Sequence, residues 1–253
     1  MSLLELRQVS RRFGGIQALS GVSLEVGAGE TVGLIGPNGA GKTTLFDCIS
    51  GTTRPDAGTI FFDGARIDRL PVHRRARRGI GRTFQKIELF AGTSVRDHLL
   101  VAARQHHGDG RLWKDLLWRG APTEEELEEA EAMLKALGLE QVAGAPVEAI
   151  SLGQGRLLEL GRALIQRPRL LLLDEPSSGL DSRETDSLAS VLSEVQREQG
   201  TAMLLVEHDL DLVDAIAGRV YVLDFGRVIC SGRLAEVLDD AAVRTAYLGS
   251  ARG

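Results

Sequence analysis

The hydrophobic residues of this chain fall mainly into short runs. Residues 31–35, 170–173 and 201–206 are almost entirely apolar, which is typical of strands buried on both faces of a parallel sheet. In residues 22–26 apolar and polar side chains alternate, and this pattern predicts a strand with one buried face. An Asp-Gly pair at residues 63–64 ends another apolar run and indicates a hairpin turn. The chain is therefore expected to contain both parallel and antiparallel strands.

Helical signals replace strand signals between residue 94 and about residue 144. A Thr-Ser pair at residues 93–94 precedes a helical pattern that continues to Ala103. Thr123 and Glu126 then form a capping-box pattern, with acidic residues in the first turn of a second helix. The apolar stripe of this helix consists of Leu127, Ala130, Leu134 and Leu137. This stretch predicts a helical unit inserted into the strand-rich chain.

The order of these patterns predicts an α/β fold. Its parts would be a mainly parallel sheet, an antiparallel β subdomain and an inserted helical subdomain. We expect one domain over residues 1–253, a length that suits a single large α/β domain. Within it, residues 1–93 and 160–253 would form the core with the β subdomain, and residues 94–159 would form the helical subdomain.

A phosphate-binding motif stands directly after the first buried run. It fits the pattern G-x-x-x-x-G-K-[ST] and consists of Gly36, Pro37, Asn38, Gly39, Ala40, Gly41, Lys42 and Thr43, followed by Thr44. A strand precedes it and a helix ending at Gly51 follows it, which is the arrangement that cradles phosphates. Lys42 is expected to reach the β- and γ-phosphates, and the Thr43 hydroxyl to bind Mg²⁺. This motif predicts a core of the P-loop NTPase class.

Two acidic residues end the second buried run. Asp174 and Glu175 stand at its carboxyl end, where ligands bind in open α/β sheets. Adjacent carboxylates at such a position are costly unless they hold a metal ion or a proton. His208 follows the third buried run in the equivalent position. We therefore expect these three residues to act together with the phosphate-binding motif.

Composition and charge limit the function classes. The net charge of −5 gives no argument for a nucleic-acid partner, and the basic cluster at residues 73–78 is interpreted as a solvent-exposed helix face. Cys48 and Cys230 have no metal-ligand spacing and indicate inert thiols in a cytosolic protein. No apolar run approaches the roughly 18 residues of a membrane span, and the first residues lack signal-peptide features. The protein is expected to be soluble by itself and able to dock onto a membrane protein.

The motifs, in this order, resemble those of the ATPase subunits of ATP-binding cassette (ABC) transporters over nearly the whole chain. Gln85, which follows Phe84, matches the Q-loop of that family. Asp174 and Glu175 match its Mg²⁺-binding strand and catalytic glutamate. The base-stacking aromatic residue, the D-loop and the switch histidine of the family are matched by Phe13, Asp181 and His208.

The signature motif of the family is altered in this chain. Ser151, Gly153 and Gln154 match the usual Leu-Ser-Gly-Gly-Gln sequence, whereas Leu152 replaces a glycine and Gly155 replaces a polar residue. On its own, this polar stretch predicts a small turn that opens a helix running from Arg156 to Gln166. By the resemblance, the matching residues would contact the γ-phosphate of ATP bound to a second ATPase subunit.

The resemblance implies ATP hydrolysis, with ATP and Mg²⁺ bound at the phosphate loop. Thr43, Gln85 and Asp174 would hold Mg²⁺, with Asp174 acting mainly through water. Glu175 would accept a proton from the attacking water, and His208 would contact the γ-phosphate. Lysine and backbone donors of the loop would stabilise the charge that grows during transfer.

The resemblance also implies partners and a location. Two ATPase subunits, identical or different, would close on two ATP molecules and drive transmembrane permease subunits. The groove for a permease helix would lie near Gln85, Leu89 and Phe90. A solute-binding protein outside the membrane would be an indirect partner, and the ATPase would lie on the cytoplasmic face of the cell membrane. No nucleic-acid partner is expected.

A closer likeness is to the ATPases of branched-chain amino acid importers. It rests on residues 12–15, 82–85, 207–209 and 246–249, together with the long stretch 103–123. Import of branched-chain amino acids is therefore the expected function. Related systems import urea or short amides, which is one alternative. A soluble ABC ATPase that acts on DNA or ribosomes is another, although such proteins usually carry coiled-coil or tandem-cassette architecture.

Overall fold

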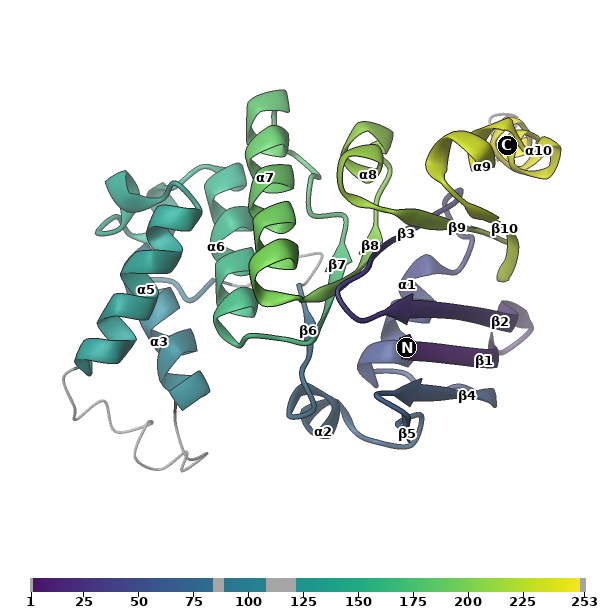
Figure 1. Ribbon diagram of the computed structural model, residues 1–253, viewed down its shortest axis with the longest axis horizontal. Helices are drawn as coiled ribbons and strands as arrows, with labels where there is room; N and C mark the ends of the chain where they lie inside the picture. Colours follow the sequence, from purple (N-terminus) through teal and green to yellow (C-terminus); the bar gives the residue numbers. More distant parts are fainter. Residues whose placement is uncertain (1, 84–88, 108–121, 251–253) are drawn as a thin grey trace.

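A computed structural model describes residues 2–83, 89–107 and 122–250 of the chain (Figure 1). Its architecture is a central six-stranded sheet with helices on one face. Within these residues, one helix and a four-stranded antiparallel sheet cover the other face. Figure 1 shows the larger helices to the left of the strands and the antiparallel sheet at the lower right. The α/β fold with a mainly parallel sheet is thus the one predicted from the sequence.

The central sheet has the strand order β10-β9-β3-β8-β7-β6. Its strands are β3 (Thr31–Ile35), β6 (Ile80–Arg82), β7 (Leu170–Asp174), β8 (Ala202–Val206), β9 (Arg219–Asp224) and β10 (Arg227–Gly232). Neighbouring strands are parallel except for β10, which pairs with β9 in the antiparallel direction. The three strands β3, β7 and β8 are buried along their whole length, in agreement with their uninterrupted apolar sequences.

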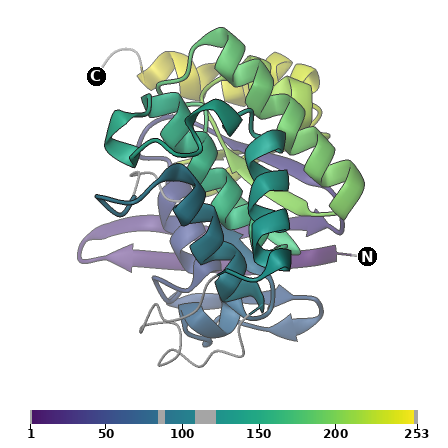
Figure 2. The ribbon, with the colours of Figure 1, turned by 90° about the vertical axis from the view of Figure 1, so that its left-hand side faces the viewer.

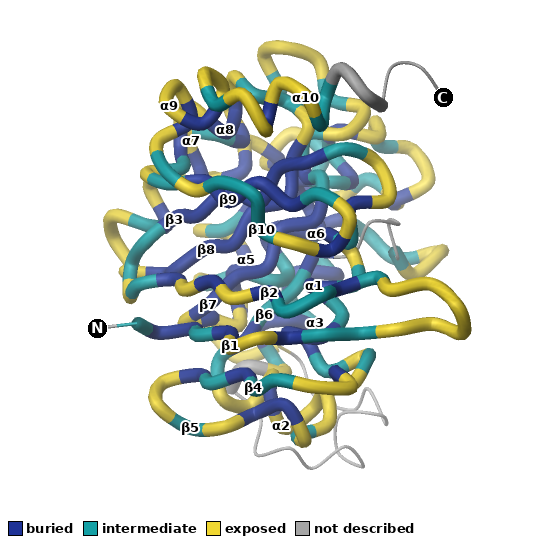
Figure 3. Tube along the Cα trace, turned by 90° about the vertical axis from the view of Figure 1, so that its right-hand side faces the viewer, coloured by how far each residue is buried: buried dark blue, intermediate teal, exposed yellow. Residues whose placement is uncertain are grey.

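The second sheet is antiparallel, with the order β2-β1-β4-β5. Its strands are β1 (Ser2–Phe13), β2 (Ile16–Gly27), β4 (Ala57–Phe62) and β5 (Ala65–Arg66). Buried and exposed residues alternate in the second half of β2, as the sequence pattern predicts. Figure 3 shows this sheet from its own side, including the exposed turn between β1 and β2.

Side chains along the central strands alternate between two hydrophobic clusters. Leu171 and Leu173 of β7 pack with the helices on one face of the sheet. Leu170 and Leu172 pack with α1 (Lys42–Ser50) and the antiparallel sheet on the other face. A strand covered on both faces needs apolar side chains at every position. The same packing fixes α1, whose N-terminus follows the end of β3, within the core.

Helices α3 (Val95–His107), α5 (Glu124–Ala136) and α6 (Leu152–Ile165) pack against one another, and Figure 2 shows them in front of the strands. Further helices are α2 (Val72–Ala76), α7 (Ser182–Gln199), α8 (Leu210–Ile216), α9 (Leu234–Asp239) and α10 (Ala241–Ser250). None of the described helices is both long enough and apolar enough to cross a membrane. The subdomain boundaries at residues 94 and 159 stay a prediction.

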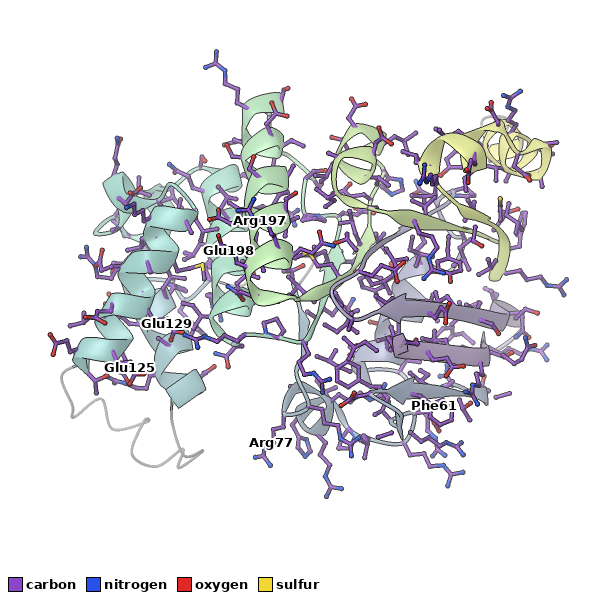
Figure 4. The ribbon with its side chains drawn as sticks, viewed as in Figure 1. Phe61, Arg77, Glu125, Glu129, Arg197 and Glu198 are labelled. Atoms are coloured by element: carbon purple, nitrogen blue, oxygen red, sulfur yellow. The ribbon has the colours of Figure 1, made fainter. Side chains whose placement is uncertain are left out.

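The basic cluster at residues 73–78 is only partly the solvent-exposed face predicted from the sequence. Arg77 is exposed and points away from the ribbon (Figure 4), but Arg75 is 1% exposed. The Arg75 guanidinium donates to the carbonyl oxygen of Cys48 at 2.6 Å and to that of Ile49 at 2.8 Å. These carbonyls lie in the last turn of α1, where oxygen atoms lack partners within the helix. The prediction is therefore wrong for Arg75, which caps α1.

The apolar stripe of α5 is shorter than predicted. Three of its four predicted members are buried, but Leu127 is 39% exposed. Glu126 takes the buried position in the first turn, because it closes a capping box with Thr123 and pairs with Arg104 at 3.2 Å. The capping-box prediction is confirmed, and it overrides the apolar periodicity at this end of the helix.

Candidate nucleotide-binding site

The phosphate-binding motif lies in the turn between β3 and α1. Gly41, the N-cap of α1, has a φ angle of 107°, and a Cβ atom there would lie 2.5 Å from the carbonyl oxygen of Ala18. Only glycine fits such a backbone. No side chain of the described residues caps α1, so its first N–H groups are available to an anion, and the helix dipole adds positive potential. The turn therefore has the geometry of a phosphate cradle.

Two segments that are distant in the sequence form hydrogen bonds with this loop. The Gly226 N–H, in the turn between β9 and β10, donates to the carbonyl oxygen of Ala40 at 2.8 Å. Burial raises the pKa of Tyr247 on α10, whereas a hydrogen bond with the Gly36 backbone lowers it. Of the two backbone groups of Gly36, only the N–H can donate to the phenol oxygen and so stabilise its ionised form. The hydrogen bond therefore runs from the Gly36 N–H to the Tyr247 oxygen. Both ends of the loop are thus tied to the C-terminal part of the chain.

Lys42 already lies inside the cradle. Its side chain is 7% exposed, and Nζ donates to the carbonyl oxygens of Gly36 at 2.6 Å and Pro37 at 3.0 Å. Burial lowers the pKa of Lys42, and the charges of Glu175 and Asp174 raise it. Phosphate oxygens can replace the two carbonyl oxygens as acceptors, and the ammonium charge is therefore in place before a nucleotide arrives.

The acidic pair after β7 has two different environments. Asp174 is 2% exposed; burial raises the pKa of its carboxyl, and a hydrogen bond from Arg82 lowers it. Glu175 has a φ angle of 50°, which is uncommon for a residue other than glycine, while its N–H donates to Val206 at 2.9 Å. Its Oε1 lies 2.9 Å from Nε2 of His208. The ends of β7 and β8 thus bring the predicted proton acceptor and the switch histidine into contact.

The predicted Mg²⁺ ligands offer the oxygen atoms that this ion prefers. The Thr43 side chain is exposed in the first turn of α1, next to the half-buried Thr44, and Asp174 ends β7. Among the described residues, no group of three or more His, Cys, Asp or Glu side chains is arranged to hold a metal ion. Mg²⁺ usually takes only one or two protein oxygens together with substrate phosphates, so a hydroxyl and a carboxylate beside a phosphate cradle fit it. The third predicted ligand, Gln85, lies outside the described residues.

The signature residues form the start of α6 rather than a turn before it. The Ser151 hydroxyl accepts the N–H of Gln154 at 3.1 Å, and Oε1 of Gln154 accepts the N–H of Ser151 at 2.9 Å. This is a capping box, with Gln154 in the place more often taken by glutamate. Gly153 lies in the same first turn and is buried. The predicted start of the helix at Arg156 is therefore wrong by about one turn.

Two further predicted site residues stand at the ends of their elements. Asp181 is the N-cap of α7 and forms a capping box with Glu184. Phe13 ends β1 with 46% of its surface exposed, and Cζ of Arg11 lies 4.6 Å from its ring centroid. The exposed ring is accessible to a purine base, and base stacking by Phe13 stays a prediction.

The role of Glu207 was missed in the sequence. Its side chain is 2% exposed, and it accepts the N–H of Ser177 at 2.8 Å and that of His208 at 2.9 Å. It therefore joins the loop after β7 to the loop after β8 and holds the histidine backbone. Glu207 is an acidic residue directly after a buried strand, and the same sequence pattern identified Asp174, so the pattern could have pointed to Glu207 as well.

A cavity of about 470 Å³ lies beside the nucleotide site, between α2 and β6 on one side and α3 and α6 on the other. Its lining includes Arg77, Arg82 and Arg162. Arg162 also lies over the ring of Phe90, with Cζ 5.4 Å from the ring centroid, and Phe90 is 58% exposed. The region in which a permease groove is predicted therefore borders this cavity.

Two family models match the chain. The model described as "ABC transporter" matches residues 19–178, which is more than half of the chain. The model described as "Branched-chain amino acid ATP-binding cassette transporter" matches residues 227–252.

Individual proteins and solved structures agree with these models. The high-affinity branched-chain amino acid transport ATP-binding protein BraF of Pseudomonas aeruginosa is 38% identical over 252 residues, with 98% of each chain covered. The ADP conformation of MJ1267, an ATP-binding cassette of an ABC transporter, matches with a TM-score of 0.83 at 31% identity, over 98% of this chain and 99% of that chain. The dimeric cassette MJ0796 bound to ADP and Pi matches with a TM-score of 0.77 at 26% identity, over 91% of this chain and 98% of that chain. The chain therefore belongs to the ABC transporter family, as an ATP-binding subunit that hydrolyses ATP to power transport.

Proposed function

We propose that this ATPase powers the import of branched-chain amino acids through a membrane permease. The observation that carries the proposal is the family match at residues 227–252, a segment that comprises β10, α9 and α10. Within it, Tyr247 makes its hydrogen bond with Gly36. The segment that relates this chain to the branched-chain amino acid cassettes is thus in direct contact with the phosphate loop. Similarity to BraF along the whole chain supports the same assignment.

In the proposed reaction, the phosphate loop and Lys42 bind the phosphates and stabilise the charge that moves onto the leaving group. Mg²⁺, held by Thr43 and Asp174, would neutralise charge on the β- and γ-phosphate oxygens. Glu175 accepts a proton from water as the water oxygen bonds to the γ-phosphorus and the bond to the bridging oxygen breaks. His208 orients the Glu175 carboxylate through their 2.9 Å contact, and its ring can turn to the γ-phosphate when ATP is bound.

Two such subunits are proposed to enclose two ATP molecules. The start of α6 carries Ser151 and Gln154 at the protein surface, where they can approach the γ-phosphate held by a second subunit. A helix N-terminus is suited to this contact because it attracts anions. The dimeric arrangement of MJ0796 with ADP and Pi is a precedent for paired cassettes.

The permease is proposed to bind at the cavity between α2 and α6. Val72, which lines the cavity, is 48% exposed, and Phe90, whose ring lies against the lining residue Arg162, is 58% exposed. A groove with exposed apolar side chains accepts the apolar face of an amphipathic helix. Bound in this way, the subunit would lie on the cytoplasmic face of the membrane, opposite the solute-binding protein.

Uptake of labelled leucine, isoleucine and valine by cells that carry the native transporter tests this function. Glu175→Gln should abolish uptake, because the attacking water loses its proton acceptor, and ATP should stay bound to the purified complex. Glu198→Gln is the matched control. Glu198 is an exposed carboxylate near the end of α7, 3.5 Å from Arg197 (Figure 4), and its replacement should leave uptake unchanged.

Uptake of all three amino acids that persists in Glu175→Gln cells would overturn the proposal. Loss of urea or amide uptake with normal leucine uptake would assign the ATPase to a different importer. Recovery of the chain from native membranes together with permease subunits would support the transport role, whereas recovery with ribosomes or DNA alone would remove it.

A further inference from the structure

Arg82 joins two parts of the nucleotide site that are far apart in the sequence. It is the last residue of β6. Its Nη1 donates to Oδ1 of Asp47 at 2.6 Å, and its Nη2 donates to Oδ2 of Asp174 at 3.1 Å. Asp47 belongs to α1, the helix that begins at the phosphate loop, and Asp174 ends β7. One guanidinium therefore ties the phosphate-loop helix to the strand that carries the predicted Mg²⁺ carboxylate.

The contact with Asp174 is shielded from water. The exposed fraction is 1% for the Asp174 side chain, 15% for that of Arg82 and 28% for that of Asp47. A buried carboxylate without a cation is strongly unfavourable. The planar guanidinium also fixes the direction of its hydrogen bonds, which a flexible ammonium group does not. Arg82 therefore determines where the Asp174 oxygens lie.

The same side chain reaches the cavity beside the site. Arg82 is one of the residues that line the cavity between α2 and α6. Its Nε is buried and, within the described part of the chain, has no hydrogen-bond partner. Because Nε is shielded, the guanidinium makes its hydrogen bonds through Nη1 and Nη2, the atoms that hold Asp47 and Asp174.

We propose that Arg82 is a positioning residue of the ATPase, which holds Asp174 for the Mg²⁺–ATP complex. The inference rests on the proposed role of Asp174 but not on the identity of the imported solute.

Binding of methylanthraniloyl-ATP to the isolated subunit tests the positioning role. The readout is the ratio of the dissociation constant in EDTA to that in Mg²⁺. Arg82→Gln should lower this ratio about tenfold, the size expected for one charge-assisted hydrogen bond, and leave the affinity in EDTA within about twofold. Asp47→Asn should lower it less, because Asp174 keeps its cation. Arg82→Lys should restore only part of the ratio, because a single ammonium cannot reproduce the fork geometry.

Arg77→Gln is the matched control, since Arg77 lines the same cavity and is exposed. An unchanged ratio in Arg82→Gln would overturn the proposal. Equal losses of affinity in EDTA and in Mg²⁺ would also overturn it, because they indicate a purely structural role. If Arg82→Gln does not fold, unchanged ratios in Arg82→Lys and Asp47→Asn decide against it. If the imported solute proved not to be a branched-chain amino acid, the expected ratios of the dissociation constants would not change.

Discussion

Helices α1 and α6 both begin at residues predicted to touch ATP, but their first turns are built differently (Figure 1). α1 begins at Gly41, without a side-chain cap among the described residues. α6 begins at Ser151, whose hydroxyl and backbone N–H are both bonded to Gln154. The backbone donors of α1 are thus left for a ligand, whereas those at the start of α6 are partly satisfied within the chain.

This difference corresponds to what each helix must do before ATP arrives. The phosphate loop takes its shape from the backbone and holds the Lys42 charge inside, so phosphates need only replace the two carbonyl oxygens as acceptors of Lys42. Ser151 and Leu152, at the start of α6, are exposed, and the capping box orders this turn within the single chain. We therefore expect ATP to bind first at α1, and the contact with α6 to form later, in competition with the capping box.

The largest effect on this comparison should come from Gly41→Ala. Its Cβ atom would lie 2.5 Å from the Ala18 oxygen, so the loop must change shape. We expect the ATP affinity, measured by calorimetry, to fall roughly 100-fold. Gly39→Ala is the matched control, since Gly39 has a φ angle of 79° but open space around it. Gly39→Ala should weaken ATP binding only by the cost of the positive φ angle, about 1 kcal/mol. Similar losses in both variants would contradict the close contact with Ala18 as the cause.

The phosphate loop is also the part of the site that the sequence predicts most completely, because its information is local. Its strand, its glycines and its helix are contiguous, and the order of residue types dictates the turn. The uninterrupted apolar runs likewise predict β3, β7 and β8 to within one residue at each end. Such strands are recognisable because burial on both faces constrains every position.

Contacts between distant residues could not be predicted in this way. Arg75 and Arg82 have the sequence context of surface charges, but α1 and β7 supply carbonyl and carboxylate partners that only the folded chain brings near. Tyr247 finds its partner, Gly36, at the opposite end of the chain. No periodic pattern encodes such pairs, since each depends on the packing of elements rather than on the residues beside it. The sequence therefore predicts which groups bind phosphate, and the fold determines what holds them in place.

A smaller effect should follow when the support behind α1 is removed. Tyr247→Phe deletes the oxygen that accepts the Gly36 N–H and leaves this donor unpaired in a buried position. We expect the free energy of unfolding to fall by about 1–2 kcal/mol, and the ATP affinity to weaken because Gly36 opens the phosphate loop. Thr245→Ala, which removes an exposed hydroxyl from the same helix, is the control. Loss of stability with unchanged ATP affinity would show that α10 supports the fold but not the loop.

The pH dependence of this pair gives a separate check. Burial raises the pKa of Tyr247 above its usual value of 10.0, so the folded state favours the neutral phenol. The stabilisation is fully present below pH 10 and is lost as the pH rises through the raised pKa. Denaturation curves should therefore show a constant difference between wild type and Tyr247→Phe from about pH 6 to about pH 9, and a decreasing one at higher pH. A difference that grows at high pH would contradict this account.

The smallest effect should come from the start of α6. Ser151→Ala removes the cap and should lower the free energy of unfolding by about 1 kcal/mol, and Gln154→Ala should cost less because it removes only the return bond. Since both bonds belong to one capping box, the double variant should lose less than the sum of the two, which a double-mutant cycle measures by chemical denaturation. Additive losses would mean that the two bonds act independently. The capping box would then not act as a unit that competes with ATP for the start of α6. The expectation that ATP binds first at α1 and later at α6 would lose its basis.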